Sequence, residues 1–406
     1  MKIAIIGAGP AGIFTSYFLR NFDGEVFLFE QNEKIGEKLK LTGGGRMNVT
    51  NKVFSAEDFS SSSKNLLKNL FKSPWVDRRE ELFEELGIKY KWENDRAILA
   101  NESALAEVER LTDLLGKQKN LRIFTSCIVL KIEKIENGFI VKFEKENLSK
   151  EEEFDVVVVG SGGMFRIGDY GNAEKLYKIP LELGHTVTNL KPSLCPIVVP
   201  NNPLKDLSGI AFNGKLFDVT GKKNVTGDIL ITHNGISGPA VLDFSSMMEG
   251  KNIELCFVAE ETEENFEKEF WKLREGKETV KNFIHSFLPN RICDFLLRKN
   301  GITPETHIAS IGKNVFKKLQ KDLFHFELKD VNLPDYQFAW TTKGGIPLDE
   351  INVSTLESRL CGGLYFAGEV LDVNGLCGGY NISFAAISGK IASEAIMENQ
   401  KRERKN

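Results

Sequence analysis

Cysteine and histidine are sparse in this 406-residue sequence, and neither forms a tight cluster. The six cysteines and five histidines include no C-x-x-C, H-x-x-x-H or H-E-x-x-H pattern. Zinc sites and disulfide frameworks need closer, repeated spacings. We therefore expect no metal centre and no disulfide scaffold, and a reduced, cytoplasmic setting is the simplest interpretation.

Long hydrophobic runs are also missing from the sequence. No stretch of about 20 apolar residues is present, so we expect no membrane span. The apolar start of the chain superficially resembles a signal peptide, but Gly7, Gly9, Pro10 and Gly12 interrupt it. No small-residue cleavage site follows, and we expect the protein to stay in the cytoplasm.

The chain has no strong excess of charge of either sign. Lys and Arg total 53 against 57 Asp and Glu, which gives a formal net charge of −4. This balance removes the usual electrostatic argument for a nucleic-acid or membrane-surface partner, so neither is expected. Hydrophobic residues at 41% and charged residues at 27% are typical of a core-forming chain, and at about 150 residues per domain the length predicts two to three domains.

What the sequence does contain is a glycine-rich turn near its start, between a short strand (3–6) and a helical pattern (13–22). In a G-x-G-x-x-G turn the glycines permit a tight bend, close approach of a pyrophosphate and close packing of helix on strand. A second strand (26–29) ends at Glu30, 18 residues after Gly12, where a carboxylate can accept hydrogen bonds from ribose hydroxyls. The pattern predicts an adenine-dinucleotide site that contains Gly7, Gly9, Pro10, Ala11, Gly12, Glu30 and Gln31.

A glycine-rich loop over residues 36–51 favours FAD over NAD. An NAD dehydrogenase does not need such a loop directly after its ribose-binding acid, whereas FAD needs room along its extended length. Three successive glycines supply backbone N–H groups without side-chain obstruction. The candidate FAD-binding residues in this loop are Lys38, Gly43, Gly44, Gly45, Arg46 and Asn48.

Two further apolar strands end in glycine and extend this pattern through the chain. Residues 154–159 precede Gly160-Ser161-Gly162-Gly163, and residues 364–367 precede Gly368, with a closing helical pattern over 382–397. The charged stretch 145–153 is interpreted as a solvated turn. These segments add Gly160, Gly162, Gly163 and Gly368 to the candidate cofactor residues, with Ile128 from a strand over 128–135.

The organisation is α/β, with a Rossmann-type domain that is made of both ends of the chain. Short apolar runs separated by Gly, Asn, Asp and Pro predict an inserted β-barrel-like domain over 191–261. Helical patterns predict a second inserted domain over 262–335. The Rossmann-type domain would then comprise residues 1–190 and 336–406.

The sequence resembles the BaiN/YhiN-like flavoproteins along most of its length. Residues 42–51 are similar to that family's [S/T]-G-G-G-R-C-N-x-T-N signature, with Met47 where the family usually has Cys. Further matches follow in order at 184–186, 191–194, 232–239, 344–346, 363–375 and 378–381. The resemblance implies an FAD-dependent oxidoreductase with the two-dinucleotide-binding-domain fold. The absence of the thiol at Met47 indicates chemistry that rests on the flavin alone.

The residues of the carboxy-terminal matches are also placed where they could contact the cofactor. Glu369 and Asp372 follow a buried strand, where a carboxylate can hold the ribityl hydroxyls or a pyrophosphate-bound water; the less favoured alternative is that both are ordinary helix or turn caps. Gly379, Tyr380 and Asn381 lead into the last helix. The amino terminus of that helix would point at the pyrimidine edge of the flavin, where negative charge accumulates on reduction.

Catalytic side chains are poorly defined by the sequence. His233 follows an apolar strand and could transfer a proton in a substrate cavity, or could equally hold the following loop through backbone hydrogen bonds. Asn48 is the other candidate.

The resemblance suggests NAD(P)H-driven reduction of an activated C=C bond in a hydrophobic small molecule, by hydride transfer through flavin N5. No second G-x-G-x-x-G is present, so NAD(P)H is expected to bind transiently at the flavin. Two alternatives stay open, an oxidase of small amines or aminoketones and a non-enzymatic flavin-binding redox sensor. The net charge argues against an RNA partner for such a sensor.

Overall fold

The computed structural model describes residues 1–100, 103–164, 177–220 and 222–404. It divides into two compact units, which we call unit 1 (Met1–Pro192 and Trp340–Asn406) and unit 2 (Ser193–Ala339). Unit 1 contains both ends of the chain, and unit 2 is inserted into it. The further division of the inserted part into a β domain and a helical domain stays a prediction.

Unit 1 is built around a seven-stranded sheet in the order β20-β21-β22-β11-β1-β2-β7. The five strands from β22 to β7 run parallel, and β20 and β21 add an antiparallel edge. The strands are β1 (Lys2–Ile6), β2 (Glu25–Phe29), β7 (Leu121–Phe124), β11 (Val156–Val159), β20 (Ile351–Asn352), β21 (Glu357–Ser358) and β22 (Leu364–Phe366). The near-continuous apolar sequence of β1, β2, β11 and β22 is explained by their burial, because parallel strands are covered on both faces.

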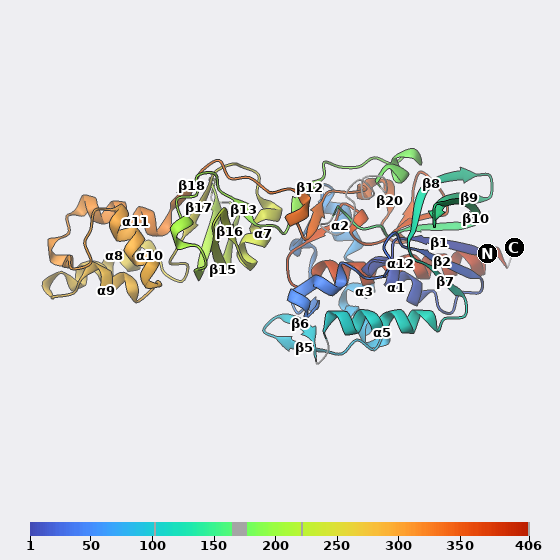
Figure 1. Ribbon diagram of the computed structural model, residues 1–406, viewed down its shortest axis with the longest axis horizontal. Helices are drawn as coiled ribbons and strands as arrows, with labels where there is room; N and C mark the ends of the chain where they lie inside the picture. The colour runs from blue at the N-terminus through green and yellow to red at the C-terminus, as the bar shows by residue number, and fades with distance from the viewer. Residues whose placement is uncertain (101–102, 165–176, 221, 405–406) are drawn as a thin grey trace. The chain divides into compact units, whose positions relative to one another are not determined.

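Helices pack along this sheet (Figure 1). Helix α1 is buried over almost its whole length because it lies against both the sheet and α12. Gly389 of α12 lies close to Thr15 of α1, where an added Cβ would come within 2.8 Å of the Thr15 hydroxyl. The helices of unit 1 are α1 (Pro10–Phe18), α2 (Lys64–Leu70), α3 (Pro74–Asp77), α4 (Arg79–Glu85), α5 (Ala104–Gly116) and α12 (Tyr380–Glu403).

Smaller sheets surround the central one. They have the orders β10-β9-β8, β3-β6-β5, β23-β4 and β12-β19. Their strands are β3 (Asn48–Asn51), β4 (Phe59–Ser60), β5 (Tyr90–Glu93), β6 (Arg96–Leu99), β8 (Cys127–Ile135), β9 (Gly138–Lys145), β10 (Leu148–Phe154), β12 (Lys191–Ser193), β19 (Thr341–Lys343) and β23 (Asn374–Gly375).

The interpretation of residues 145–153 as a turn was wrong. Most of this stretch is strand β10, which pairs antiparallel with β9 from Leu148↔Lys145 to Phe154↔Phe139. Its charged side chains are largely exposed. Charged residues are typical of edge strands because they prevent pairing with other chains, so the charge pattern concealed a strand.

Unit 2 contains a six-stranded antiparallel sheet in the order β13-β16-β15-β14-β17-β18. Val198 of β13 exchanges backbone hydrogen bonds of 2.9 Å with Asn332, four residues after β18 ends. Four residues span at most about 14 Å, whereas five strand spacings in a flat sheet would span about 24 Å. The sheet must therefore curl back on itself, as in a barrel. Its strands are β13 (Ile197–Val198), β14 (Ala211–Asp218), β15 (Asn224–Thr232), β16 (Gly235–Ser237), β17 (Ile253–Cys256) and β18 (Phe326–Leu328).

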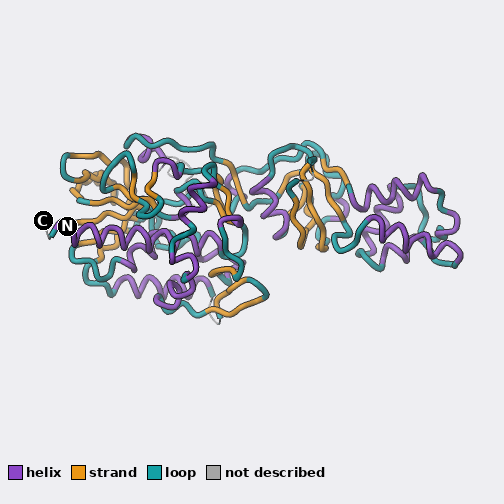
Figure 2. The backbone as a smooth tube through the Cα atoms, turned by 180° about the vertical axis from the view of Figure 1, so that it is seen from behind, coloured by secondary structure: helices purple, strands orange, loops and turns teal. Residues whose placement is uncertain are grey.

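The helices of unit 2 share one hydrophobic core with this sheet. Figure 2 shows the strands of unit 2 grouped together and most of its helices grouped beside them. Residues of both groups form a single buried cluster, with Phe270 and Phe316 in contact at a ring-centroid distance of 4.6 Å. The helices are α7 (Pro239–Met247), α8 (Glu263–Lys272), α9 (Val280–His285), α10 (Asn290–Lys299) and α11 (Lys313–Phe324).

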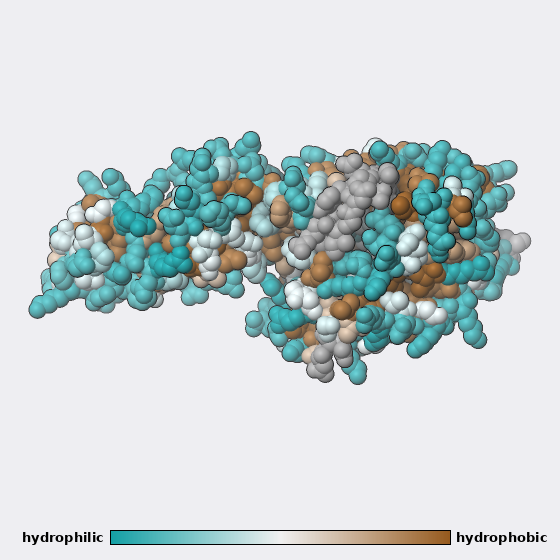
Figure 3. All heavy atoms as spheres, in the orientation of Figure 1, coloured by the Kyte–Doolittle hydropathy of each residue, from teal (hydrophilic) through white to brown (hydrophobic). Residues whose placement is uncertain are grey.

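In the view of Figure 3, hydrophilic residues cover most of the visible surface of this helical part. Along the described segments of both units, every helix is too short or too polar to cross a bilayer.

Replacing Phe270 by Ala should lower the free energy of unfolding of unit 2 by about 3–5 kcal/mol, because it leaves a cavity in a fully buried core. Phe287→Ala, at a position that is 39% exposed and contacts Phe266 and Phe283 at the edge of the core, is the matched control and should cost clearly less. Urea unfolding followed by tryptophan fluorescence, to which Trp271 beside Phe270 contributes, measures both. Equal losses in the two variants would contradict this account of the core.

Candidate functional site

Three glycine-containing turns meet at one edge of the central sheet, where β1, β11 and β22 end. A Cβ on Gly7, whose φ is +95°, would lie 2.8 Å from the carbonyl oxygen of Gly160. A Cβ added to Gly368 would lie 2.7 Å from the Cβ atom of Ala11. The turns after the three parallel strands are therefore in contact, and the glycines that the sequence placed far apart belong to one site.

The turn that follows β1 leaves open space for a ligand. Helix α1 begins at Pro10 with Gly9 as its N-cap, and no side chain caps its free N–H groups. An added Cβ on Gly9, Gly44, Gly45 or Gly162 would meet no atom within 4 Å. A helix amino terminus beside side-chain-free backbone is a site for phosphate groups.

Glu30 lies buried at the end of β2, next to this turn. Its Oε2 accepts a hydrogen bond from the Ala8 N–H at 2.7 Å, and its Oε1 accepts from the backbone and side-chain N–H groups of Asn32 at 2.9 and 2.7 Å. Burial raises the pKa of the Glu30 carboxyl, and these N–H donors oppose the rise. Gln31 follows directly, and the N–H of Cys127, beside Ile128, donates to the Glu30 carbonyl at 2.9 Å.

The signature loop runs through two short 3-10 turns over Leu39–Gly45 into strand β3. Met47 is fully buried with φ +50°, so the residue that replaces the family's Cys is part of the core. The Asn48 carboxamide packs against Gly43. Arg46 is exposed and forms an ion pair of 3.0 Å with Glu93 of β5.

An ion pair between Lys38 and Glu369 joins the amino-terminal and carboxy-terminal segments of unit 1. The other Glu369 oxygen, Oε1, accepts a hydrogen bond from the Thr342 N–H at 2.8 Å. Gly163 lies directly against this group, because a Cβ there would come within 2.8 Å of Glu369 Oε1. Three of the predicted residues, Lys38, Gly163 and Glu369, thus form one contact group with Thr342.

The remaining carboxy-terminal candidates hold the chain around the start of α12. Asp372 is buried, and its Oδ2 accepts from the N–H and hydroxyl of Ser62. The Asn381 side chain bonds to the N–H and carbonyl of Gly375, both at 2.9 Å. Tyr380 stacks on Phe54 at 5.8 Å in a buried aromatic cluster. Their expected contacts with a flavin stay predictions.

Gly379 is the N-cap of α12 and lies against β3. Its φ is +102°, and a Cβ would come within 2.7 Å of the Thr50 backbone. The amino terminus of the last helix is thus packed on the strand that ends the signature loop.

The sequence analysis missed Arg79, a positive charge that is 8% exposed in α4. Its guanidinium donates to Thr50 Oγ1 at 3.2 Å, to the Asn51 carbonyl at 2.8 Å and to the Lys52 and Val76 carbonyls. Burial lowers the pKa of this guanidinium, which stays charged because an arginine is not deprotonated in proteins. Arg79 therefore positions β3. Arg79 lies three and four residues before the buried Leu82 and Phe83, so it shares their face of the helix. This spacing was the available sequence signal that Arg79 is buried.

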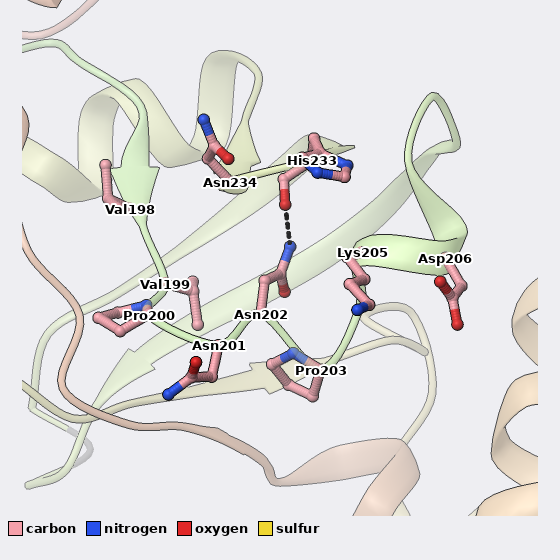
Figure 4. Close-up of a pocket in the computed structure, with 10 residues that line it drawn as sticks. All are labelled: Val198, Val199, Pro200, Asn201, Asn202, Pro203, Lys205, Asp206, His233 and Asn234. Carbon is pink, nitrogen blue, oxygen red and sulfur yellow. Dashed lines mark hydrogen bonds between the residues drawn. The ribbon is translucent and has the colours of Figure 1, made fainter.

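The two catalytic candidates lie in different units, Asn48 in unit 1 and His233 in unit 2. His233 and Asn234 form the tip of the hairpin between β15 and β16, and His233 is exposed. It lines a pocket of about 620 Å³ that lies within unit 2 (Figure 4).

The cysteines offer no reactive thiol pair. Five of the six are buried, and Cys377 is partly buried. Burial raises the pKa of Cys127, Cys195, Cys256 and Cys293 to about 11, so these thiols are protonated at neutral pH. Within the described ranges, no three His, Cys, Asp or Glu residues gather as a metal site.

Comparison with known proteins identifies the family. The HI0933-like protein Rossmann domain matches residues 1–395. The chain belongs to the HI0933-like family. This confirms the resemblance to the BaiN/YhiN-like flavoproteins.

This HI0933-like protein has relatives with two different names. It is 27% identical to the 3-dehydro-bile acid delta(4,6)-reductase of Clostridium scindens, over 98% of this chain and 99% of that protein. It is 30% identical to the ribosomal RNA dihydrouridine synthase of Haemophilus influenzae, over 94% of each chain. It is therefore a member of an FAD-dependent oxidoreductase family of enzymes.

Solved structures share its fold. The 3-ketosteroid-delta4-(5alpha)-dehydrogenase of Rhodococcus jostii is 12% identical, with a TM-score of 0.52 over 97% of this chain and 96% of that one. The predicted Rossmann-type FAD-binding α/β fold is thereby confirmed.

The residues of the site fit FAD. Open glycine backbone at the start of α1 suits the pyrophosphate, buried Glu30 suits the ribose, and the loop over Leu39–Gly45 leaves room along the extended cofactor. The contact group of Lys38 and Glu369 and the α12 amino terminus would hold the flavin part.

Gly9→Val should fold normally but retain little FAD, because the added side chain meets no protein atom and fills the space of the pyrophosphate. Glu30→Ala should also be flavin-poor, through loss of the ribose acceptor. Gly116→Val and Glu109→Ala, both in α5, are matched controls, because Gly116 has open space around it and Glu109 is exposed. Flavin absorbance per protein, alongside the circular dichroism spectrum, measures the result. Full flavin loading of the first two variants would refute the assignment of this site.

Arg79→Met should lower the free energy of unfolding by about 3 kcal/mol and reduce FAD content, because it leaves buried acceptors of β3 without a donor. The neighbouring Arg78 is exposed and paired with Glu81, so Arg78→Met should cost less than about 1 kcal/mol. Thermal unfolding and flavin release are the measurements. Arg79→Met with wild-type stability and flavin content would contradict the positioning role.

Proposed function

We propose that this HI0933-like flavoprotein reduces a carbon–carbon double bond conjugated to a carbonyl group, with NAD(P)H as the electron source. The observation that carries the proposal is the pair of relatives whose names share this reaction type on unrelated substrates. A delta(4,6)-reductase and a dihydrouridine synthase both saturate a C=C bond. Because the two relatives act on different substrates but reduce the same type of bond, we assign reduction of a C=C bond to this chain as well.

FAD, when bound, supplies hydride transfer at its N5 atom. The side chains of this protein bind and orient it. The turn of Gly7–Gly12 would hold the phosphates, Glu30 would hold the ribose, and Lys38, fixed by its ion pair with Glu369, would place an ammonium donor at the flavin part of the site. The amino terminus of α12 adds positive potential, which stabilises negative charge on a reduced cofactor.

Two substrate classes agree with this reaction. The first is the hydrophobic enone-type small molecule that the sequence suggested, supported by the bile acid reductase. The second is uridine in RNA, supported by the dihydrouridine synthase at 30% identity. The expectation of no nucleic-acid partner rested on the net charge of −4 and does not weigh against a single uridine site. Asn48 and His233 stay the candidate catalytic groups.

Anaerobic stopped-flow absorbance tests the reaction. We expect NADH or NADPH to bleach the flavin rapidly, and either a steroid enone or a uridine-containing RNA to restore its colour. The saturated ketone and an RNA in which cytidine replaces uridine are the matched controls, because they lack the conjugated bond or present a different base.

The same experiment separates the alternatives. A flavin that stays oxidised with NAD(P)H but is bleached by an amine or aminoketone would identify an oxidase. A flavin that NAD(P)H reduces but neither acceptor reoxidises would disprove the reductase for both substrate classes.

A further inference from the structure

Arg96, the first residue of strand β6, carries a positive charge that no motif of the sequence singled out. Its side chain is partly buried. Among the described residues, the guanidinium has no hydrogen bond, ion pair or ring contact. A guanidinium has several N–H donors, and burying part of it without an acceptor costs free energy. The described chain does not supply the acceptor that this side chain needs.

The acids near Arg96 are already paired with other cations. Glu93 lies opposite Arg96 in the β5–β6 pair, but it forms an ion pair of 3.0 Å with Arg46. Asp95 is exposed and lies 3.9 Å from the Lys52 ammonium. The charge of Arg96 is therefore not balanced within its own hairpin.

Strand pairing places Arg96 on one face of the sheet with Asn48 and Asn51. Arg96 pairs with Asn51, and residues directly opposite each other share a face. Ile98, two positions further along β6, pairs with Asn48 and shares this face too. A β-bulge between Asn48 and Thr50 turns the two asparagines to the same side. The guanidinium and the candidate catalytic group Asn48 thus belong to one side of the sheet.

The segments that border this face carry residues predicted to bind FAD. At Gly43 of the signature loop, an added Cβ would lie 3.0 Å from Asn48 Oδ1. At Gly378, an added Cβ would lie 3.1 Å from Arg96 Nε and 3.4 Å from Asn51 Nδ2. The Asn51 side chain also donates to the Gly378 carbonyl at 3.3 Å. Arg96 therefore lies against the turn that leads into α12, on the face that the signature loop contacts.

The start of α12 adds positive potential beside Arg96. Gly379 is the N-cap, no side chain caps the helix, and its first turn contains no acidic residue. A helix amino terminus carries a partial positive charge, so it repels a guanidinium and attracts an anion. An arginine held next to this terminus, with its charge unbalanced by the described residues, is stabilised when a negative charge is bound there.

We propose that Arg96 balances the negative charge that FAD acquires on reduction, beside the start of α12, and so favours the reduced cofactor. The inference rests on the proposed function, because it takes FAD to lie along the signature loop and the start of α12. Hydride transfer moves an electron pair and a proton from NAD(P)H to FAD, which leaves NAD(P)⁺ and adds a negative charge to the cofactor. The guanidinium interacts more strongly with the charged, reduced ring than with the neutral, oxidised ring, so it raises the reduction potential.

The reduction potential of the FAD-loaded full-length protein tests this role. The flavin is reduced with dithionite in equilibrium with a reference dye, without NAD(P)H or substrate, and absorbance gives the oxidised and reduced fractions. Arg96→Met should destabilise the reduced form about tenfold relative to the oxidised form, which lowers the two-electron potential by about 30 mV. Arg96→Gln keeps donors without the charge and should show the same fall, whereas Arg96→Lys keeps the charge and should recover most of it.

Lys91→Met is the matched control. Lys91 is an exposed cation of the neighbouring strand β5, and its ammonium lies 3.6 Å from Glu93, which balances its charge. Its removal should leave the potential unchanged. For a variant that releases FAD, the ratio of its dissociation constants for oxidised and reduced FAD gives the same quantity.

An unchanged potential in both Arg96→Met and Arg96→Gln, or an equal fall in Lys91→Met, would overturn the proposal, even if substrate turnover falls. These measurements contain neither NAD(P)H nor an acceptor. Such a result beside enone- or uridine-dependent flavin reoxidation would reject the role of Arg96 and leave the reductase standing. The expected fall in a protein whose flavin NAD(P)H does not reduce would support the role of Arg96 and reject the reductase.

Discussion

The close approach of backbone to backbone where the parallel strands of unit 1 end is the constraint on which the rest of the site depends. Gly7 lies against Gly160 and Gly368 lies against Ala11, at distances that leave no room for additional side-chain atoms. Because these turns touch, the amino terminus of α1 and the buried Glu30 face the same space. A dinucleotide can then contact all of them at once.

A second group of contacts fixes the signature loop against the last helix. Arg79 holds the strand after the loop, the Ser383 hydroxyl of α12 lies 2.8 Å from Thr50 Oγ1, and Gly379 packs on the same strand. Lys38 and Glu369 close the other end of the loop. The loop is rich in glycine and would be mobile alone, so its conformation depends on these distant partners.

The parts of the site with local signals could be predicted. The turn of Gly7–Gly12 and the acid Glu30 lie in one β-α-β segment, whose spacing is set by chain geometry. Strand β10 was missed because its exposed charges hide the alternation that marks a strand, and only its pairing with β9 reveals it. Arg79 was missed because a charged residue on an amphipathic helix is usually exposed, and its buried acceptors lie about 28 residues away in the sequence.

The sequence by itself determined the fold class and the family, because these follow from short-range spacing and from motifs in order along the chain. It also predicted which residues would surround the phosphates and ribose of the cofactor. Only the tertiary structure decided that Lys38 meets Glu369 and that Arg79 supports β3. It also decided that Arg96 lies against Gly378, beside the start of α12. Those contacts join segments separated by long stretches of chain, and they form only when packing of the sheets and helices brings the segments together.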